Sequence, residues 1–252
     1  MPYHMNDFLI LAFLFFCGSL VGWSLEVVFR RFFSSANPSR RWINPGFLTG
    51  PYLPLYGFSL CILYVLAECE QYISIDSIFW RKSLLFVFMA ISITLFEYIA
   101  GLIFIKGLKT KLWDYSENKY NIQGIICPLF TFFWWLLSAI YYFFIHNSIL
   151  TSLEWLSQNL AFSFFIGMFY GIIIIDISNS LQLVFKIKQF AVENDVVVKY
   201  EKLRHTIHEE NLKRRERISF LFNFTSKGNL HENLKTYLIN ELEHKNKKDD
   251  KK

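Results

Sequence analysis

The sequence lacks the cysteine patterns that accompany disulfide frameworks and zinc sites. Its four cysteines, Cys17, Cys61, Cys69 and Cys127, lie in or beside apolar segments, without CxxC spacing and without clustered histidines. Such spacing is needed to bring several thiolates or imidazoles around one metal ion. We interpret these residues as small side chains of a packed core, and we expect neither a metal nor another cofactor.

Charge is scarce over most of the chain. Of the 26 Lys and Arg in 252 residues, 10 precede position 186 and 16 lie from it onward. The net charge of +5 therefore describes mainly the C-terminal part, and it does not indicate a nucleic-acid-binding surface. The GxxxxGK[ST] loop of ATP-hydrolysing sites is also absent, so we expect no ATPase site in this chain. The first apolar run lacks a charged n-region and a small-residue cleavage site, which predicts a retained anchor.

Long apolar runs are what the sequence has instead. A hydrocarbon core of about 30 Å needs about 20 apolar residues in a helix. A small soluble domain has no room for five such helices that are apolar on all sides. We predict an all-α polytopic membrane protein: residues 1–185 form the transmembrane domain, 186–244 a charged helical tail, and 245–252 a disordered end. The expected spans are about five in number: 7–30, 50–69, 83–105, 127–146 and 160–184.

The basic residues predict the orientation of these spans. Four arginines fall between the first two spans and four lysines between the third and fourth, whereas the other loops hold only Arg81 and Lys82. Because short cytoplasmic loops carry the excess of Lys and Arg, the N-terminus is expected outside and both basic loops and the tail inside.

An internal repeat is a further hypothesis. Two hairpins share the order of an acidic residue in a span, an asparagine in a basic loop, and a proline seven residues later. The first contains Glu26, Asn44 and Pro51, and the second contains Glu97, Asn121 and Pro128. Both hairpins run in the same direction in the expected topology, as parallel repeats do. Coincidence between two helical hairpins is the alternative.

Three acidic residues inside apolar spans are the strongest candidates for a site. Glu26, Glu97 and Asp176 each occupy a position where an acidic group costs about 2.5–3.5 kcal/mol at the bilayer centre. All three fall in the cytoplasmic half of their spans, which favours convergence on one inward-facing cavity. The alternative is structural bonding: Arg30 lies one helical turn from Glu26, while the other two need a loop base, a bound cation or a proton.

The loops supply the other candidate residues for substrate binding. The segment 44–57, which begins at Asn44, is rich in proline and glycine yet apolar, so it fits either a cavity wall or a tight turn before a helix. Asp114, in an aromatic stretch beside a basic run, and Asn121 complete the set. We find no nucleophile–base pair and therefore name no catalytic residue.

The tail contains an apolar stripe at helical spacing, formed by Val196, Tyr200, Leu203 and Ile207. This helix would pair with another helix or lie on the anionic inner leaflet, or it would be solvated. A basic cluster from Lys213 to Arg217 favours the leaflet electrostatically.

These motifs resemble the Putative ABC-transporter type IV family, the CmpB-like membrane proteins. The departures from its pattern are Pro45, Pro128 and Thr131, and the tail lies outside the resemblance. The resembling residues lie within about residues 1–180: Gly22-Trp23 with Glu26, the segment 44–57, Glu97-Tyr98 with Gly101, residues 113–116, and Asn121, Gly124 and Cys127.

The resemblance implies a bacterial inner-membrane protein and a transport component, without naming a substrate. If ATP drives it, a separate ATPase chain must supply the nucleotide site. Our first hypothesis is a transport-related subunit whose acidic cavity holds a cation or a basic small molecule. The alternatives are a membrane enzyme acting on a lipid-like substrate and a noncatalytic scaffold or regulator whose tail docks a partner, so enzyme status is left open, with non-enzyme favoured.

Overall fold

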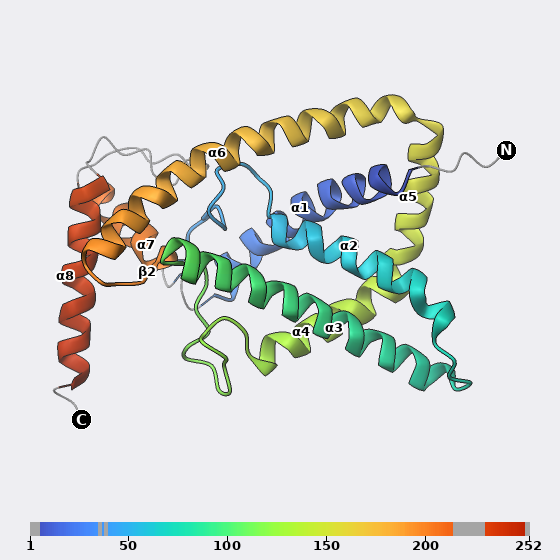
Figure 1. The fold of residues 1–252 in the computed structure, drawn as a ribbon, viewed down its shortest axis with the longest axis horizontal. Coiled ribbons are helices and arrows are strands. Elements are labelled where there is room, and N and C mark those ends of the chain that lie inside the picture. The colour runs from blue at the N-terminus through green and yellow to red at the C-terminus, as the bar shows by residue number, and fades with distance from the viewer. Residues whose placement is uncertain (1–5, 35–36, 38–39, 214–229, 250–252) are drawn as a thin grey trace. The chain divides into compact units, whose positions relative to one another are not determined.

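The computed structural model describes residues 6–34, 37, 40–213 and 230–249, and these are mostly helical (Figure 1). The part of the expected basic cluster beyond Lys213 lies outside the described residues. The α-helices are α1 Asp7–Phe32, α2 Pro54–Glu68, α3 Ile78–Leu102, α4 Pro128–Ile140, α5 His146–Gln158, α6 Ser163–Glu193, α7 Tyr200–Lys213 and α8 Leu230–Asp249.

Several short elements extend or connect these helices. A π-helical turn, Ile103–Gly107, continues α3, and another, Tyr141–Ile145, joins α4 to α5. Two 3-10 turns, Cys69–Tyr72 and Leu160–Phe162, follow α2 and precede α6. Two strands, β1 Thr110–Lys111 and β2 Val198–Lys199, pair in parallel.

Within the described residues, four helical segments are long and apolar enough to cross a membrane. They are Asp7–Phe32, Ile78–Gly107, Pro128–Gln158 and Leu160–Glu193. Helix α2 has 15 residues and rises only about 22 Å, which is less than the hydrocarbon thickness. The expected membrane protein is thus confirmed with four long helices, whereas the fifth span, 50–69, stays a prediction.

Proline marks the start of two helices. Pro54 is at the first position of α2 and Pro128 at the first position of α4, each after a residue with extended backbone. This position suits proline because its fixed φ is helical and its missing N–H would have no helical partner there. Helix α2 therefore starts three residues later than Pro51. The irregular segment that precedes it comprises residues 44–53.

The chain divides into two compact units, and the division falls inside α1, α3 and α6. Unit 1 comprises Met1–Leu25, Tyr52–Ala100 and Tyr115–Ile175, and unit 2 comprises Glu26–Pro51, Gly101–Asp114 and Asp176–Lys252. Unit 1 holds most of the apolar helical residues. Unit 2 combines the first basic loop, the part of the second basic loop up to Asp114, and the tail.

In unit 1, α2 packs closely and antiparallel against α1. A Cβ on Gly22 would lie 2.2 Å from the Tyr56 Cβ, and one on Gly57 would lie 2.3 Å from the Ser19 Oγ. Farther along α2, Cys61 Sγ donates to the Leu11 carbonyl at 3.4 Å. The glycines are therefore needed because the two helix backbones approach too closely for a side chain between them.

In unit 2, the apolar stripe of the tail is buried. Tyr200, Leu203 and Ile207 are at most 2 % exposed, and they pack with Phe190 of α6 and Leu234 of α8. The stripe thus packs against helices of the same chain, which was one of the three expected alternatives for this helix.

The end of α8 differs from the expectation from the sequence. Residues 245–249 are helical, where the sequence predicts a disordered end. Three of these five residues are lysine, a good helix former, which favours a helix in this strongly polar segment.

Candidate functional site

Glu97 lies on α3 in unit 1 and is 3 % exposed. The Tyr115 hydroxyl donates to its Oε1 at 3.2 Å, and the Trp134 indole N–H of α4 donates to its Oε2 at 3.0 Å. The Tyr115 ring stacks on Phe130 at 4.2 Å between centroids, which fixes the position of the phenol. The carboxylate is therefore held between α3, α4 and the loop that connects them.

A polar seam continues from Glu97 along the same helix pair. One turn away on α3, the Thr94 hydroxyl donates to the Thr131 hydroxyl of α4 at 3.2 Å. Thr131 in turn donates to the Cys127 carbonyl at 3.3 Å. Polar groups on both facing surfaces would be unfavourable in hydrocarbon without such bonds, so the seam fixes how α3 meets α4.

Asn121 shapes the loop that delivers Tyr115. Its amide donates to the carbonyls of Ser116 and Asn118 at 3.2 and 2.8 Å, and its oxygen accepts from the Gly124 N–H at 2.9 Å. The Tyr115 N–H donates to the Gly124 carbonyl at 2.8 Å, which closes the loop. Gly124 has φ of 64°, a conformation that glycine adopts without strain. Asn121 therefore acts on Glu97 through the loop.

Asp176 on α6 binds the irregular segment of unit 2. Its carboxylate accepts the N–H of Thr49 at 3.0 Å, the N–H of Gly50 at 2.9 Å and the Thr49 hydroxyl at 2.6 Å. Ser180, one turn along α6, donates at 3.1 Å. The side chain is 6 % exposed. Backbone amides thus stabilise this buried carboxylate, a source of donors that the sequence analysis did not consider.

Asn44 joins the same segment to the tail. Its side-chain amide donates to the Thr49 backbone carbonyl at 2.9 Å. Its backbone carbonyl accepts a hydrogen bond from Arg204 of α7. Arg204 is 8 % exposed. Burial, and then the nearby charge of Arg30, lower the pKa of Arg204 to about 10, so the guanidinium remains charged at neutral pH.

The other two acidic candidates form ion pairs in unit 2. Glu26 accepts from Arg30 at 2.9 Å, which confirms the pair expected one turn apart, and Arg30 also bonds to Glu201 of α7. Asp114 lies 2.7 Å from the Lys111 ammonium and 2.8 Å from that of Lys199. These bonds link the end of α1 and the loop after β1 to the tail.

The structure thus divides the six candidate residues between the units. Asn44 and Asp176 both bond to Thr49, and Glu26 and Asp114 belong to the same unit. Glu97 and Asn121 belong to unit 1. Convergence of the three acidic residues on one cavity stays a prediction.

One polar cluster escaped the sequence analysis. In unit 1, the Tyr141 hydroxyl lies 3.0 Å from His146 Nδ1, whose Nε2 lies 3.6 Å from Glu68, while Glu70 bonds to Tyr142 and, at 3.2 Å, to Arg81. The sequence held a signal for this cluster. Two acidic residues, Glu68 and Glu70, follow one apolar run, and Tyr141, Tyr142 and His146 lie near the end of another. Within the described residues, no group of three or more His, Cys, Asp or Glu side chains could hold a metal ion.

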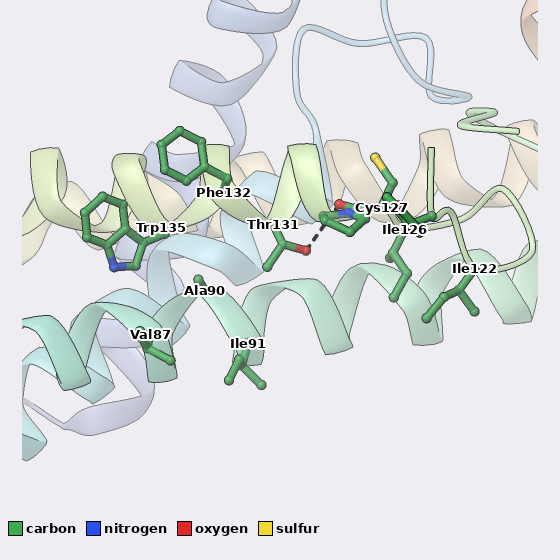
Figure 2. A pocket seen from close by; sticks show the side chains of 11 residues that line it. Val87, Ala90, Ile91, Ile122, Ile126, Cys127, Thr131, Phe132 and Trp135 are labelled. Atoms are coloured by element: carbon green, nitrogen blue, oxygen red, sulfur yellow. Dashed lines mark hydrogen bonds between the residues drawn. The ribbon is translucent and has the colours of Figure 1, made fainter. Parts of the chain in front are cut away.

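A pocket of about 440 Å³ lies between α3 and α4 in unit 1 (Figure 2). Val87, Ala90 and Ile91 of α3 face Thr131 and Trp135 of α4 across it. The connecting loop closes one end with residues from 120 to 127. None of the six candidate residues lines this pocket.

Comparison with known proteins identifies a family for this chain. The model of the family described as Putative ABC-transporter type IV matches residues 13–181. Neither the curated proteins nor the solved structures compared with the chain gave a match. The matched region runs from within α1 to within α6 and contains all six candidate residues. The chain therefore belongs to the Putative ABC-transporter type IV family.

Proposed function

We propose that the chain is the membrane-embedded subunit of a transport system, with a separate chain supplying ATP hydrolysis. Family membership and four long apolar helices support this reading. The sequence contains no GxxxxGK[ST] loop, so an ATP-driven system requires a second protein. The family name also points away from catalysis.

The observation that carries the proposal is the burial of Glu97 inside the segment Ile78–Gly107. An ionisable residue in a transmembrane helix indicates a substrate or ion pathway more often than a structural role. Tyr115 and Trp134 orient the carboxylate with uncharged donors. Glu97 is therefore the residue that we assign to binding a cation or the basic group of a small molecule, with Asn121 positioning the loop.

Asp176, Asn44, Glu26 and Asp114 receive a supporting role in this proposal. Their hydrogen bonds and ion pairs join α6, the irregular segment and the tail within unit 2. A change at the tail would therefore reach α6 through Arg204 and Asn44. This route suits a subunit that must respond to a partner on the cytoplasmic side.

The membrane placement follows from the charges. We place the protein in the bacterial cytoplasmic membrane, with the N-terminus outside and the tail inside, because both basic loops and the tail would then be cytoplasmic. Helix α2 serves as the fifth span. Its support is the antiparallel packing against α1 and the 3-10 turn Cys69–Tyr72, which lengthens it.

The test compares Glu97→Gln with Glu117→Gln, a matched change at an exposed loop position. Both variants and the wild-type chain are expressed from the native locus with an affinity tag, solubilised and purified with their bound proteins. We expect an ATPase chain to be recovered with all three. The substrate of that system should then be transported by the wild type and Glu117→Gln, with at least a tenfold loss for Glu97→Gln, or about 1.4 kcal/mol.

Two results would contradict the proposal. If no ATPase chain is recovered even after cross-linking, the proposal that the chain is a subunit of an ATP-driven transport system is wrong. Full transport by Glu97→Gln would show that the buried carboxylate serves packing alone.

A further inference from the structure

We infer that the pocket between α3 and α4 is a binding site for one acyl chain of a membrane phospholipid. This inference needs only that α3 and α4 lie in a bilayer, and it does not depend on transport. The pocket volume of about 440 Å³ lies within the range of about 300–1,000 Å³ typical of small-molecule sites.

The shape of the pocket favours a chain over a compact molecule. The lining positions of α4 are Pro128, Thr131, Phe132 and Trp135, which follow one face of the helix over about 10 Å. Figure 2 shows the side chains of α3 along the other wall, with Val87 and Ala90 opposite the Trp135 end. The result is a groove parallel to the helix axis, the direction that an acyl chain takes in a bilayer.

The chemistry of the lining favours hydrocarbon. Apart from the Thr131 hydroxyl, the side chains that line the groove are aliphatic, aromatic or thiol groups and the Tyr120 ring. Thr131 already accepts from Thr94 and donates to the Cys127 carbonyl. The groove therefore offers apolar surface and little to a polar ligand.

The surroundings identify the source of the chain. Val87 and Ile91 are 43 % and 54 % exposed, and neighbouring apolar residues outside the groove, such as Phe88 and Leu95, are also exposed. In a membrane these faces meet lipid, so acyl chains surround the mouth of the groove. At the loop end, Lys119 is exposed next to Tyr120, where an ammonium and an amphipathic ring suit a phosphate headgroup.

The experiment maps lipid contacts directly. The full-length protein is reconstituted in vesicles of phosphatidylethanolamine and phosphatidylglycerol that contain a phospholipid with a diazirine in its acyl chain. After irradiation, labelled residues are located by mass spectrometry. We expect labelling at 87–91 and 131–135 to exceed that at Ile174 and Ile175, exposed residues of α6, by about tenfold.

A filled groove provides the matched comparison. The double variant Val87→Trp/Ile91→Trp places bulk in the groove at two exposed positions, so it should lower labelling at 131–135 to the level of α6. The control Phe88→Trp/Leu95→Trp adds the same rings to the same helix outside the groove, and it should leave the labelling at 131–135 unchanged.

Three results would overturn the inference. Labelling at the groove equal to that of α6 would show ordinary lipid contact without a site. An equal decrease in the control variant would show that the groove has no special role. Exclusion of the lipid label from 87–91 and 131–135 in the wild-type chain would mean that protein, such as a second copy, fills the groove.

Discussion

Single polar side chains decide how the irregular loops attach to the apolar helices. Asp176 accepts hydrogen bonds from two backbone N–H groups and two hydroxyls. Glu97 accepts hydrogen bonds from the Tyr115 hydroxyl and the Trp134 indole N–H. A buried carboxylate costs free energy unless hydrogen bonds satisfy it, so each of these residues requires its loop in place. The segment around Thr49 in turn depends on Asp176 as the acceptor of its backbone N–H groups.

The substitution Asp176→Asn should destabilise the protein. An amide replaces one accepting oxygen by a donor, which then faces N–H groups of Thr49 or Gly50. We expect a loss of about 1–3 kcal/mol, the usual penalty for leaving a buried polar group unsatisfied. Thermal unfolding in detergent, followed by tryptophan fluorescence, measures it.

The control for this prediction is Asp76→Asn, at an exposed position in the loop between α2 and α3. It should leave the midpoint unchanged. Equal midpoints for Asp176→Asn and the wild type would show that the bonds from the irregular segment add no net stability.

Among the elements, α1 and α2 approach each other closely in unit 1. A Cβ on Gly57 would lie 2.3 Å from Ser19 Oγ and 2.8 Å from the Phe15 carbonyl oxygen. Backbone cannot yield as a flexible side chain does, so the helices would have to separate. This contact also gives the short helix α2 its position beside α1.

The substitution Gly57→Ala should therefore destabilise unit 1, by about 1–3 kcal/mol as overpacking does in other cores. Gly171→Ala on α6 is the matched control, because a Cβ there meets nothing within 4 Å. Alanine forms helix better than glycine, so the control should be neutral or stabilising by up to about 1 kcal/mol. A midpoint for Gly57→Ala equal to that of the control would contradict the close approach.

The tail is an integral part of unit 2. Parallel pairing of β1 with β2, the Lys199–Asp114 pair and the bond from Arg204 to Asn44 all join residues of the tail to the two loops. These contacts add to the buried apolar cluster around Leu203. Residues 44 and 110–114 are thus tied to residues beyond 193.

Deletion of residues 195–252 should expose the loops. Without the tail, the apolar cluster loses Tyr200 and Leu203, and Asp114 loses one of its two lysines. Limited proteolysis of the reconstituted protein should then cleave within 40–50 and 106–114 much faster than in the full chain. Deletion of 245–252 alone is the control, and cleavage at the same rate in both truncated chains would mean that the loops order without the tail.

At the scale of the whole molecule, the number of spans determines the side of every loop after α2. If α2 crosses the membrane, residues 73–77 lie outside and 113–121 inside. If it does not and the N-terminus stays outside, these loops exchange sides. The length of α2, 15 residues, does not decide whether it crosses the membrane. Its packing along α1 favours a crossing.

Single-cysteine labelling separates the two topologies. In a chain whose four native cysteines are replaced by serine, cysteine is placed at Asp76, Lys119 or Glu154, which are exposed. We expect an impermeant maleimide to label intact cells at positions 76 and 154 and to label position 119 only after the membrane is opened. Labelling of position 119 in intact cells, together with protection of position 76, would establish four spans.

The sequence by itself determined the class of protein, four of the long helices and the apolar stripe of the tail, while the structure decided that this stripe is buried. These follow from local rules: a helix that crosses a bilayer needs a long apolar run, and an apolar stripe at helical spacing must find a partner. The ion pair of Glu26 with Arg30 was also predictable, because it depends only on a spacing of four residues.

Only the tertiary structure decided what the buried carboxylates contact. Asp176 bonds to residues 126 and 127 positions away, and its main donors are backbone N–H groups, which every residue but proline carries. Sequence patterns therefore cannot indicate which backbone N–H groups will donate to a buried carboxylate. The groove between α3 and α4 likewise exists because side chains from two helices and a loop meet around a gap, and such a gap depends on packing geometry that no single segment encodes.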